Sequence, residues 1–182
     1  MRAQILDTAL SLADRSSWEQ LTLQQVALAM QISLADIYHH FQTKDQLVDA
    51  WFDHADIAML SAQISAELPA KERLQQAIQH WLAALAPYHK LSGQMLLYKL
   101  EPGHIHLQLG GVLRISRTVQ WLREAAGLTA SGVARIGQEL ALTSLFVAVF
   151  IYWLNDRSPG QQRSLTLLQR KLQCADELHL WH

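Results

Sequence analysis

The stretch that decides the fold is residues 33–47, Ser-Leu-Ala-Asp-Ile-Tyr-His-His-Phe-Gln-Thr-Lys-Asp-Gln-Leu. Ser33 and Asp36 have the spacing of a helix-capping pair, so the pattern predicts that a short helix begins here. Ile37 and Phe41 lie four residues apart and would share the inward face of that helix. The stretch therefore predicts a short helix with a polar outer face and an apolar inner face.

Two further short helices are predicted upstream. Residues 3–14 place apolar side chains on one stripe at the helical period. Thr22 and Gln25 form a capping-box pattern that begins a helix over about 22–30. Only two residues separate this helix from the one after it, which is the length of a helix-turn-helix turn. The first forty residues are therefore expected to form three short helices, the last two as a helix-turn-helix.

Longer helices are expected in the rest of the chain, separated by proline, glycine and serine, over about 44–66, 70–86, 88–100, 105–126, 131–154 and 161–180. Gly110 and Gly111 should weaken or kink the helix that contains them. No strand pattern is present in the sequence. The predicted fold is all-α with about nine helices, in which residues 1–47 form a helix-turn-helix domain and residues 48–182 form a larger helical domain.

Composition narrows the class of protein. The chain has 182 residues, of which 50% are hydrophobic and 17% charged, with a net charge of −1, as expected of a folded chain. The single cysteine, Cys174, excludes an intrachain disulfide, and Asp7 stands where a signal peptide would be apolar, so a cytoplasmic location is expected. The longest apolar run, residues 145–154, is shorter than the roughly 20 residues of a bilayer span. We therefore expect a buried helix there and no membrane span.

The N-terminal residues resemble the DNA-binding domain of the TetR family of regulators. The similarity rests on Ile5-Leu6, Leu21-Thr22-Leu23, Val26-Ala27, Ile32-Ser33 and, above all, the Tyr38–Phe41–Lys44 run with its trailing Leu47. The resemblance implies a homodimeric regulator, a repressor, that binds a palindromic operator in double-stranded DNA. It also implies that a small effector binds in the larger domain and controls DNA binding.

The residues expected to bind DNA lie on the second and third helices and just beyond them: Thr22, Gln24, Ser33, Leu34, Ala35, Tyr38, His39 and Lys44. Tyr38, His39 and Lys44 offer donors to phosphate oxygens, which supply affinity rather than sequence choice. Leu34 and Ala35 can touch thymine methyl groups, and His39 is a further candidate for reading bases.

Two features of this region depart from the usual family pattern. Residues 1–50 contain three basic and six acidic residues, a net charge of −3, which is unfavourable on a surface that meets a polyanion. Asp36 would repel phosphate unless it reads a cytosine amine. Gln31 stands in the turn where the family usually has glycine, so a strained backbone angle is expected there. These features predict weak or salt-sensitive binding and leave open a helix-turn-helix used only for packing.

In the larger domain, the family architecture implies an effector cavity and a dimer interface. Candidate walls of the cavity are the aromatic and methionine residues Trp81, Tyr88, Met95, Tyr98 and Trp121. Few charges fall on apolar faces in this region, so a neutral or lipophilic effector is expected. Candidate interface residues on the last two helices are Leu145, Val149, Trp153, Leu165, Leu168 and Leu172, which would form a four-helix bundle across a two-fold axis.

A second resemblance supports an alternative function. Residues 153–159 and 165–172 look similar to the C-terminal part of TetR-like lipid-binding proteins that assist ubiquinone biosynthesis. On this alternative, the chain is a lipid-binding accessory protein of the same fold without sequence-specific DNA binding. The intact Tyr38–Phe41–Lys44 run favours the regulator.

Enzyme and metal-site hypotheses find little support in the sequence. The nine histidines include the neighbours His39 and His40, which point to different sides of a helix, and His104 and His106, which also diverge. No glycine-rich phosphate loop, nucleophile elbow or paired-carboxylate pattern is present. The acids Asp49, Asp53 and Asp56 are interpreted as helix-surface residues. We therefore expect a protein without catalytic activity, metal or cofactor.

Overall fold

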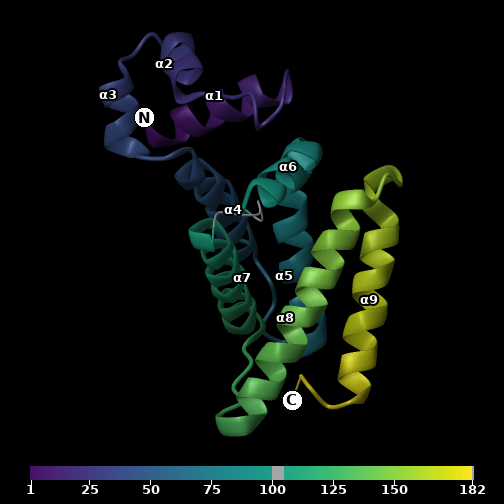
Figure 1. Ribbon diagram of the computed structural model, residues 1–182. Coiled ribbons are helices and arrows are strands. Elements are labelled where there is room, and N and C mark those ends of the chain that lie inside the picture. Colours follow the sequence, from purple (N-terminus) through teal and green to yellow (C-terminus); the bar gives the residue numbers. More distant parts are fainter. Residues whose placement is uncertain (100–104, 182) are drawn as a thin grey trace. The chain divides into compact units, whose positions relative to one another are not determined.

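The computed structural model describes residues 1–99 and 105–181, and for residues 105–108 it describes the helix but not the side chains. Within these residues every regular element is helical, which confirms the all-α prediction (Figure 1). The predicted helix end at residues 101–103 lies outside the described residues.

The helices follow the predicted order: α1 Arg2–Asp14, α2 Leu23–Met30, α3 Leu34–His40, α4 Lys44–Leu60, α5 Ala70–Leu85, α6 His89–Lys99, α7 Ile105–Ala126, α8 Gly132–Asn155 and α9 Gln162–Glu177. Short 3-10 turns, η1 Ala86–Tyr88 and η2 Pro159–Gln161, precede α6 and α9. The main difference is that α4 ends at Leu60 rather than near residue 66. Beyond the helix, the Ser65 hydroxyl accepts a hydrogen bond from the backbone N–H of Glu67 (3.3 Å), a local bond of the kind found in turns. α7 continues through Gly110 and Gly111 as one helix.

The chain divides into two compact units. Unit 1 comprises residues 1–54 and 85–111, and unit 2 comprises residues 55–84 and 112–182. Helices α4 and α7 contribute residues to both. These units do not test the predicted boundary at residue 47 between a DNA-binding domain and a larger domain, which stays a prediction.

The N-terminal part of unit 1 has an apolar core. α1 packs on α2 and α2 on α3, and the core side chains include Ile5, Leu10, Val26, Ile37 and Phe41, each at most 2% exposed. Ile37 and Phe41 lie on the inner side of α3, as their spacing predicts. The polar side chains of the three helices are thereby left at the surface of this part.

A buried lysine fastens α6 to the start of α4 in unit 1. Lys99 is 3% exposed, and its Nζ contacts the carboxylates of Asp45 (2.5 Å) and Asp49 (2.9 Å). The two acids lie four residues apart on one face of α4, so both reach the same cation. Nearby, Trp51 donates its Nε1 hydrogen to the hydroxyl of Ser92 (2.9 Å). These polar contacts hold α4 and α6 together within unit 1.

In unit 2, α8 and α9 run side by side (Figure 1). The turn between them is held by Asp156, which accepts hydrogen bonds from the backbone and hydroxyl of Ser158 (2.9 and 2.7 Å) and of Ser164 (2.8 and 2.7 Å). Burial raises the pKa of Asp156, but these four bonds outweigh it and hold the pKa well below its usual range. Asp156 therefore fixes the direction in which α9 leaves α8.

α8 carries apolar side chains on its exposed face as well as on its buried face. By length and composition its 24 residues could cross a bilayer, although 39% of its most apolar window is buried inside the protein. The prediction of no membrane span rested on residues 145–154, and the length and composition of the complete helix are only weak evidence against it. Packing within unit 2 accounts for one face of α8, where Leu142, Val149 and Trp153 are buried. The other face stays apolar and exposed.

Candidate nucleic-acid interface

The outer face of α3 carries four of the side chains that the sequence predicts to bind DNA. Leu34 is 49% and Tyr38 60% exposed, and Ala35 and His39 are exposed as well. Thr22 and Gln24, at the start of α2, are also exposed. Buried Ile37 fixes this orientation, because it holds the opposite side of the short helix against the core. α3 thus has the solvent-facing polar and apolar groups that contact with DNA requires.

The capping boxes predicted at the starts of α2 and α3 are both present, but they differ in whether the capping hydroxyl can still donate a hydrogen bond to DNA. At α2, the hydroxyl of Thr22 accepts from the Gln25 backbone (3.2 Å) and keeps its own hydrogen. At α3, the Ser33 hydroxyl donates to Asp36 (2.6 Å), which also accepts from the Ser33 backbone (2.9 Å). Hydrogen bonds from Ser33 lower the pKa of Asp36, which stays ionised. Thr22 can therefore donate to a phosphate, whereas the Ser33 hydrogen is already used and Asp36 serves the cap.

The turn of the helix-turn-helix contains the expected strain. Gln31 ends α2 in the left-handed region, with φ 56° and ψ 39°. Its backbone N–H bonds to the Ala27 and Leu28 carbonyls, so the conformation closes α2. Glycine adopts this region at no steric cost, whereas glutamine does not. The turn keeps its geometry despite the residue that occupies it.

Lys44 has a structural role that the sequence did not reveal. Its ammonium group donates to the carbonyl oxygens of Trp18 and Glu19, and it lies over the rings of Trp18 (5.0 Å) and Tyr98 (5.7 Å). Burial lowers the pKa of Lys44, and the Glu19 carboxylate opposes this effect. The ammonium thus holds the α1–α2 connection. Its contact with DNA phosphate stays a prediction.

Arg2 is a cation near the recognition helix that sequence analysis did not single out. Its Nη1 donates to the carbonyl of His40 (2.5 Å) at the end of α3, and its guanidinium lies 4.1 Å from the centre of the Phe41 ring. A cation at a helix C-terminus is favourable to the helix dipole. Arg2 therefore adds positive charge beside α3 in an otherwise acidic region.

The five predicted effector-pocket residues have different surroundings. Trp81 is buried among Phe146 and Phe150, with ring centres 5.0 Å apart, and Trp121 is 44% exposed. In unit 1, Met95 is buried. The ring of Tyr88 contacts Trp51 edge to face, and the ring of Tyr98 contacts Trp18 in the same way. The five belong to both units, so their shared role as cavity walls stays a prediction.

Unit 2 buries a charged cluster where sequence analysis expected an apolar interior. Asp56, 6% exposed, accepts hydrogen bonds from Trp81 (2.8 Å), Arg114 (2.7 Å) and Thr118 (3.0 Å), all buried. The interpretation of Asp56 as a surface acid was therefore wrong. Its register on α4 gave a signal, because Ala55 and Met59 on either side of it are apolar and buried. The expectation of few charges within this region also needs correction.

Five of the six predicted dimer-interface residues are buried within a single chain. Leu145 is 6%, Trp153 1% and Val149, Leu168 and Leu172 0% exposed, because α8 and α9 pack these side chains into unit 2. They cannot face a second subunit in this arrangement. Only Leu165 is partly accessible. The exposed apolar side chains of α8 are instead Val133 (85%), Ile136 (58%), Leu140 (65%), Ile151 (50%) and Tyr152 (44%).

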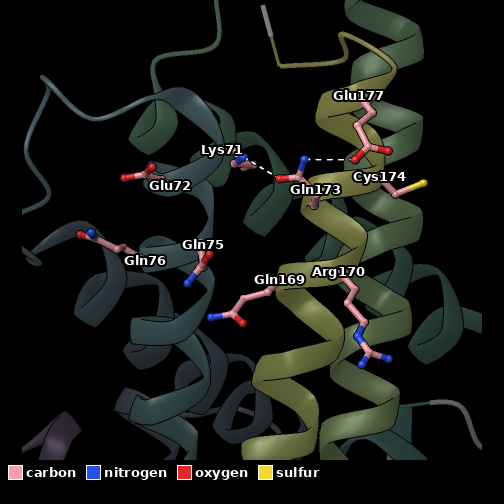
Figure 2. Close-up of a pocket in the computed structure, with 9 residues that line it drawn as sticks. All are labelled: Lys71, Glu72, Gln75, Gln76, Gln169, Arg170, Gln173, Cys174 and Glu177. Atoms are coloured by element: carbon pink, nitrogen blue, oxygen red, sulfur yellow. Dashed lines mark hydrogen bonds between the residues drawn. The ribbon is translucent and has the colours of Figure 1, made fainter.

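A groove of about 640 Å³ lies between α5 and α9 in unit 2, and Figure 2 shows the side chains that line it. Lys71 bridges it at one end, with contacts to Gln173 (2.7 Å) and Asp176 (3.1 Å). Gln75 and Gln169 extend into the gap from the two helices. This lining is polar and does not match the lipophilic effector cavity expected from the sequence. Among the described residues, no group of three or more histidine, cysteine or acidic side chains could hold a metal ion.

Comparison with known proteins supports the interpretation of the α1–α3 region. Residues 5–51 match the family described as "Bacterial regulatory proteins, tetR family". A TetR transcriptional regulator from Nitrosomonas europaea ATCC 19718 shares 41% sequence identity, and the match covers 97% of this chain and 98% of that chain, with a TM-score of 0.86. No curated protein matches the chain.

More distant structures share the fold. A TetR transcriptional regulator from Rhodococcus sp. RHA1 is 19% identical over 94% of this chain and 93% of its own, with a TM-score of 0.72. A tetR-family regulator from Streptomyces coelicolor is 17% identical over 98% of this chain and 85% of its own, with a TM-score of 0.63. The helical architecture is therefore common to chains of very different sequence.

Proposed function

Because the chain belongs to the TetR family of bacterial transcriptional regulators, we propose that it is an effector-responsive repressor that binds a palindromic operator as a homodimer. It would act in the cytoplasm, without catalysis. Residues 1–47 would form the DNA-binding domain and residues 48–182 the effector-binding and dimerisation domain.

The observation that supports DNA binding best is the outward face of α3. Leu34 and Tyr38 are large, partly apolar and about half exposed. Such exposed side chains on a short, rigid helix suit entry into the major groove. Phosphate contacts would come from Tyr38, His39, Thr22 and Gln24, with base contacts from Leu34 and Ala35.

We place the dimer interface on the exposed stripe of α8, with Val133, Ile136, Leu140 and Ile151 at its centre. The side chains lie three, four and eleven residues apart, spacings that fall on one face of a helix, and Gly137 and Ser144 between them allow a close approach of a second helix. Exposed apolar patches of this extent are rare on soluble monomers. A two-fold contact would cover the stripe on both chains at once and bury on the order of 2,000 Å².

A small, lipophilic effector is the remaining part of the proposal. The buried polar cluster at Asp56 adds a requirement: an effector that reaches it needs a hydrogen-bonding group as well as an apolar body. The lipid-binding alternative is not favoured, since Asp156 explains part of the segment that suggested it. That residue is needed to cap the start of α9, whatever the ligand.

Selection from a random duplex DNA library at low salt tests the function. The purified protein should enrich an inverted repeat with half-sites about 34–36 Å apart, one helical turn. Leu34→Ala should change the preferred bases, whereas Leu178→Ala, at a 70% exposed position of unit 2, should not. If no sequence is enriched and a lipid co-purifies, the accessory-protein function replaces this one.

Sedimentation at micromolar concentration tests the dimer. The unchanged protein should sediment as a dimer, and Leu140→Glu should give a folded monomer with greatly weakened operator binding. Ile57→Glu is the matched control, because Ile57 is equally exposed (64% against 65%) but lies on α4. A monomeric unchanged protein, or a dimeric Leu140→Glu variant, would contradict the proposed interface.

A further inference from the structure

Two histidines and an arginine meet at the C-terminal end of α3. His39 and His40 are the last residues of that helix, and the guanidinium of Arg2, at the start of α1, donates to the carbonyl of His40 (2.5 Å). His39 is exposed, like Ala35 one turn before it, and His40 is half-buried. Within residues 1–99 and 105–181, neither imidazole has a hydrogen bond or an ion pair. Both rings therefore keep their hydrogen-bonding capacity for a partner.

Arg2 supplies a fixed positive charge at the same place. Its guanidinium lies 4.1 Å from the centre of the ring of Phe41, a side chain that is 0% exposed, so it rests on a rigid part of the core. In the described part of the chain it forms no ion pair with a carboxylate. A guanidinium has several N–H donors, and the bond to His40 uses a single one of them. The other donors can bind an anion beside α3.

Most of the other charged groups around this end of α3 are already engaged. α2 contains no charged residue, and Asp36 on α3 accepts the bonds of its own helix cap. At the start of α4, the ammonium of Lys44 donates to backbone carbonyls, and Asp45 contacts the buried Lys99. On α1, the N-terminal amine is a further cation, and Asp7 lies more than one turn farther along the helix. The charge that a partner meets here therefore depends mainly on the guanidinium and the two imidazoles.

The imidazoles matter because residues 1–50 carry a net charge of −3 when histidine is counted as neutral, a sign that opposes binding to a polyanion. Histidine is the side chain whose charge ordinarily changes between pH 5 and 8. A proton on each of the two rings would bring the net charge of residues 1–50 to −1 and place two cationic donors beside Arg2. Such donors form charge-assisted hydrogen bonds with phosphate oxygens. The C-terminal end of a helix that reads DNA is a place where the backbone is contacted.

We propose that Arg2, His39 and His40 form a phosphate-binding corner whose affinity for DNA increases when the two imidazoles gain protons. Arg2 binds a backbone phosphate at any pH, and the imidazoles bind phosphate oxygens in their charged form. DNA binding is therefore coupled to proton uptake, and the affinity rises as the pH falls. The proposal rests on the proposed DNA binding and adds to it two contact residues, Arg2 and His40, and a dependence on pH.

Fluorescence anisotropy with a labelled duplex of random sequence tests the proposal, because phosphate contacts do not depend on base sequence. The full-length protein is titrated at constant low salt from pH 7.5 to pH 5.5, a range over which an ordinary histidine changes charge and the DNA phosphates do not. The affinity should rise by about tenfold for each imidazole that gains a proton at the interface, the gain expected of a charge-assisted hydrogen bond.

Three variants separate the fixed charge from the titrating ones. The double variant His39→Gln with His40→Gln keeps polar side chains that cannot gain a proton. It should bind like the unchanged protein at pH 7.5 and lose the rise toward pH 5.5. Arg2→Gln should weaken binding several-fold at both pH values and keep the rise. His80→Gln, at an exposed position of α5 in unit 2, is the matched control and should change neither.

The outcomes distinguish this proposal from the function on which it rests. A rise in affinity that survives in the double variant, or equal affinity of the unchanged protein at the two pH values, would overturn the phosphate-binding corner alone. Absence of DNA binding at every pH would overturn the proposed repressor function, and the phosphate-binding corner with it.

Discussion

The core of residues 1–47 and the core of unit 2 bury different kinds of side chain. The buried residues of the first region are all apolar, from Ile5 to Leu47. Unit 2 buries Asp56, Arg114, Arg123 and Asp156 among its apolar residues. The DNA-facing region thus keeps its polar groups at the surface, where they can contact a partner. Unit 2 instead uses polar groups internally, to join helices that are distant in sequence.

The largest expected effect concerns the buried pair in unit 2. Asp56→Ala should destabilise the protein by about 3–5 kcal/mol, because it leaves the Arg114 cation buried without its carboxylate. Urea unfolding measures the loss. The double variant Asp56→Leu with Arg114→Met should recover much of it, since an apolar pair suits a buried site. If the single and double variants were equally stable, the loss of stability in Asp56→Ala would not come from leaving the Arg114 cation unpaired.

Asp156→Asn should destabilise by about 2 kcal/mol, because an amide cannot accept all four bonds from Ser158 and Ser164. The pKa of Asp156 is depressed in the folded protein, so its contribution is complete above the unfolded value near 4. It is lost as the pH falls toward the folded value. Unfolding measured from pH 7 to 3 should therefore show a difference between variant and unchanged protein that shrinks below about pH 4. A difference that persists unchanged at pH 3 would contradict this origin.

In the DNA-binding region, substitutions of Lys44 and Tyr38 should have opposite effects: the first should lower the stability of the fold, and the second should weaken DNA binding. Lys44→Met should cost about 1–2 kcal/mol, because the carbonyls of Trp18 and Glu19 lose their shared donor. Tyr38→Phe should leave stability within about 0.5 kcal/mol, as for other exposed positions, and weaken binding to all DNA sequences alike. Thermal unfolding and titrations with labelled DNA distinguish the two. A stable Lys44→Met variant would assign Lys44 to phosphate contact alone.

The smallest expected effect is a gain. Gln31→Gly should stabilise the protein by roughly 0.5–1 kcal/mol, because glycine removes the strain of the left-handed conformation at this turn. Ala29→Gly, in the exposed right-handed part of α2, is the control and should destabilise by about 1 kcal/mol. Urea unfolding of the two variants should show opposite signs. A loss of stability in both would mean that the turn is not strained by Gln31.

The sequence predicted the DNA-binding region well because its determinants are local. Capping pairs three residues apart and apolar residues four apart both act within one helix. Accordingly, the bounds of α2 and α3, the two caps and the burial of Ile37 and Phe41 all agree with the sequence pattern. The same reasoning missed Arg2 and the structural part of Lys44, whose partners lie far along the chain.

By itself, the sequence determined the all-α class, the order of the helices and the face of α3 that points outward. Only the tertiary structure decided which apolar residues of α8 are covered, and so moved the proposed interface from Leu145, Val149 and Trp153 to Leu140 and Ile151. It also decided that Asp56 is buried beside Arg114, 58 residues away. The physical reason is that helix periodicity shows which residues share a face, whereas burial depends on what packs against that face.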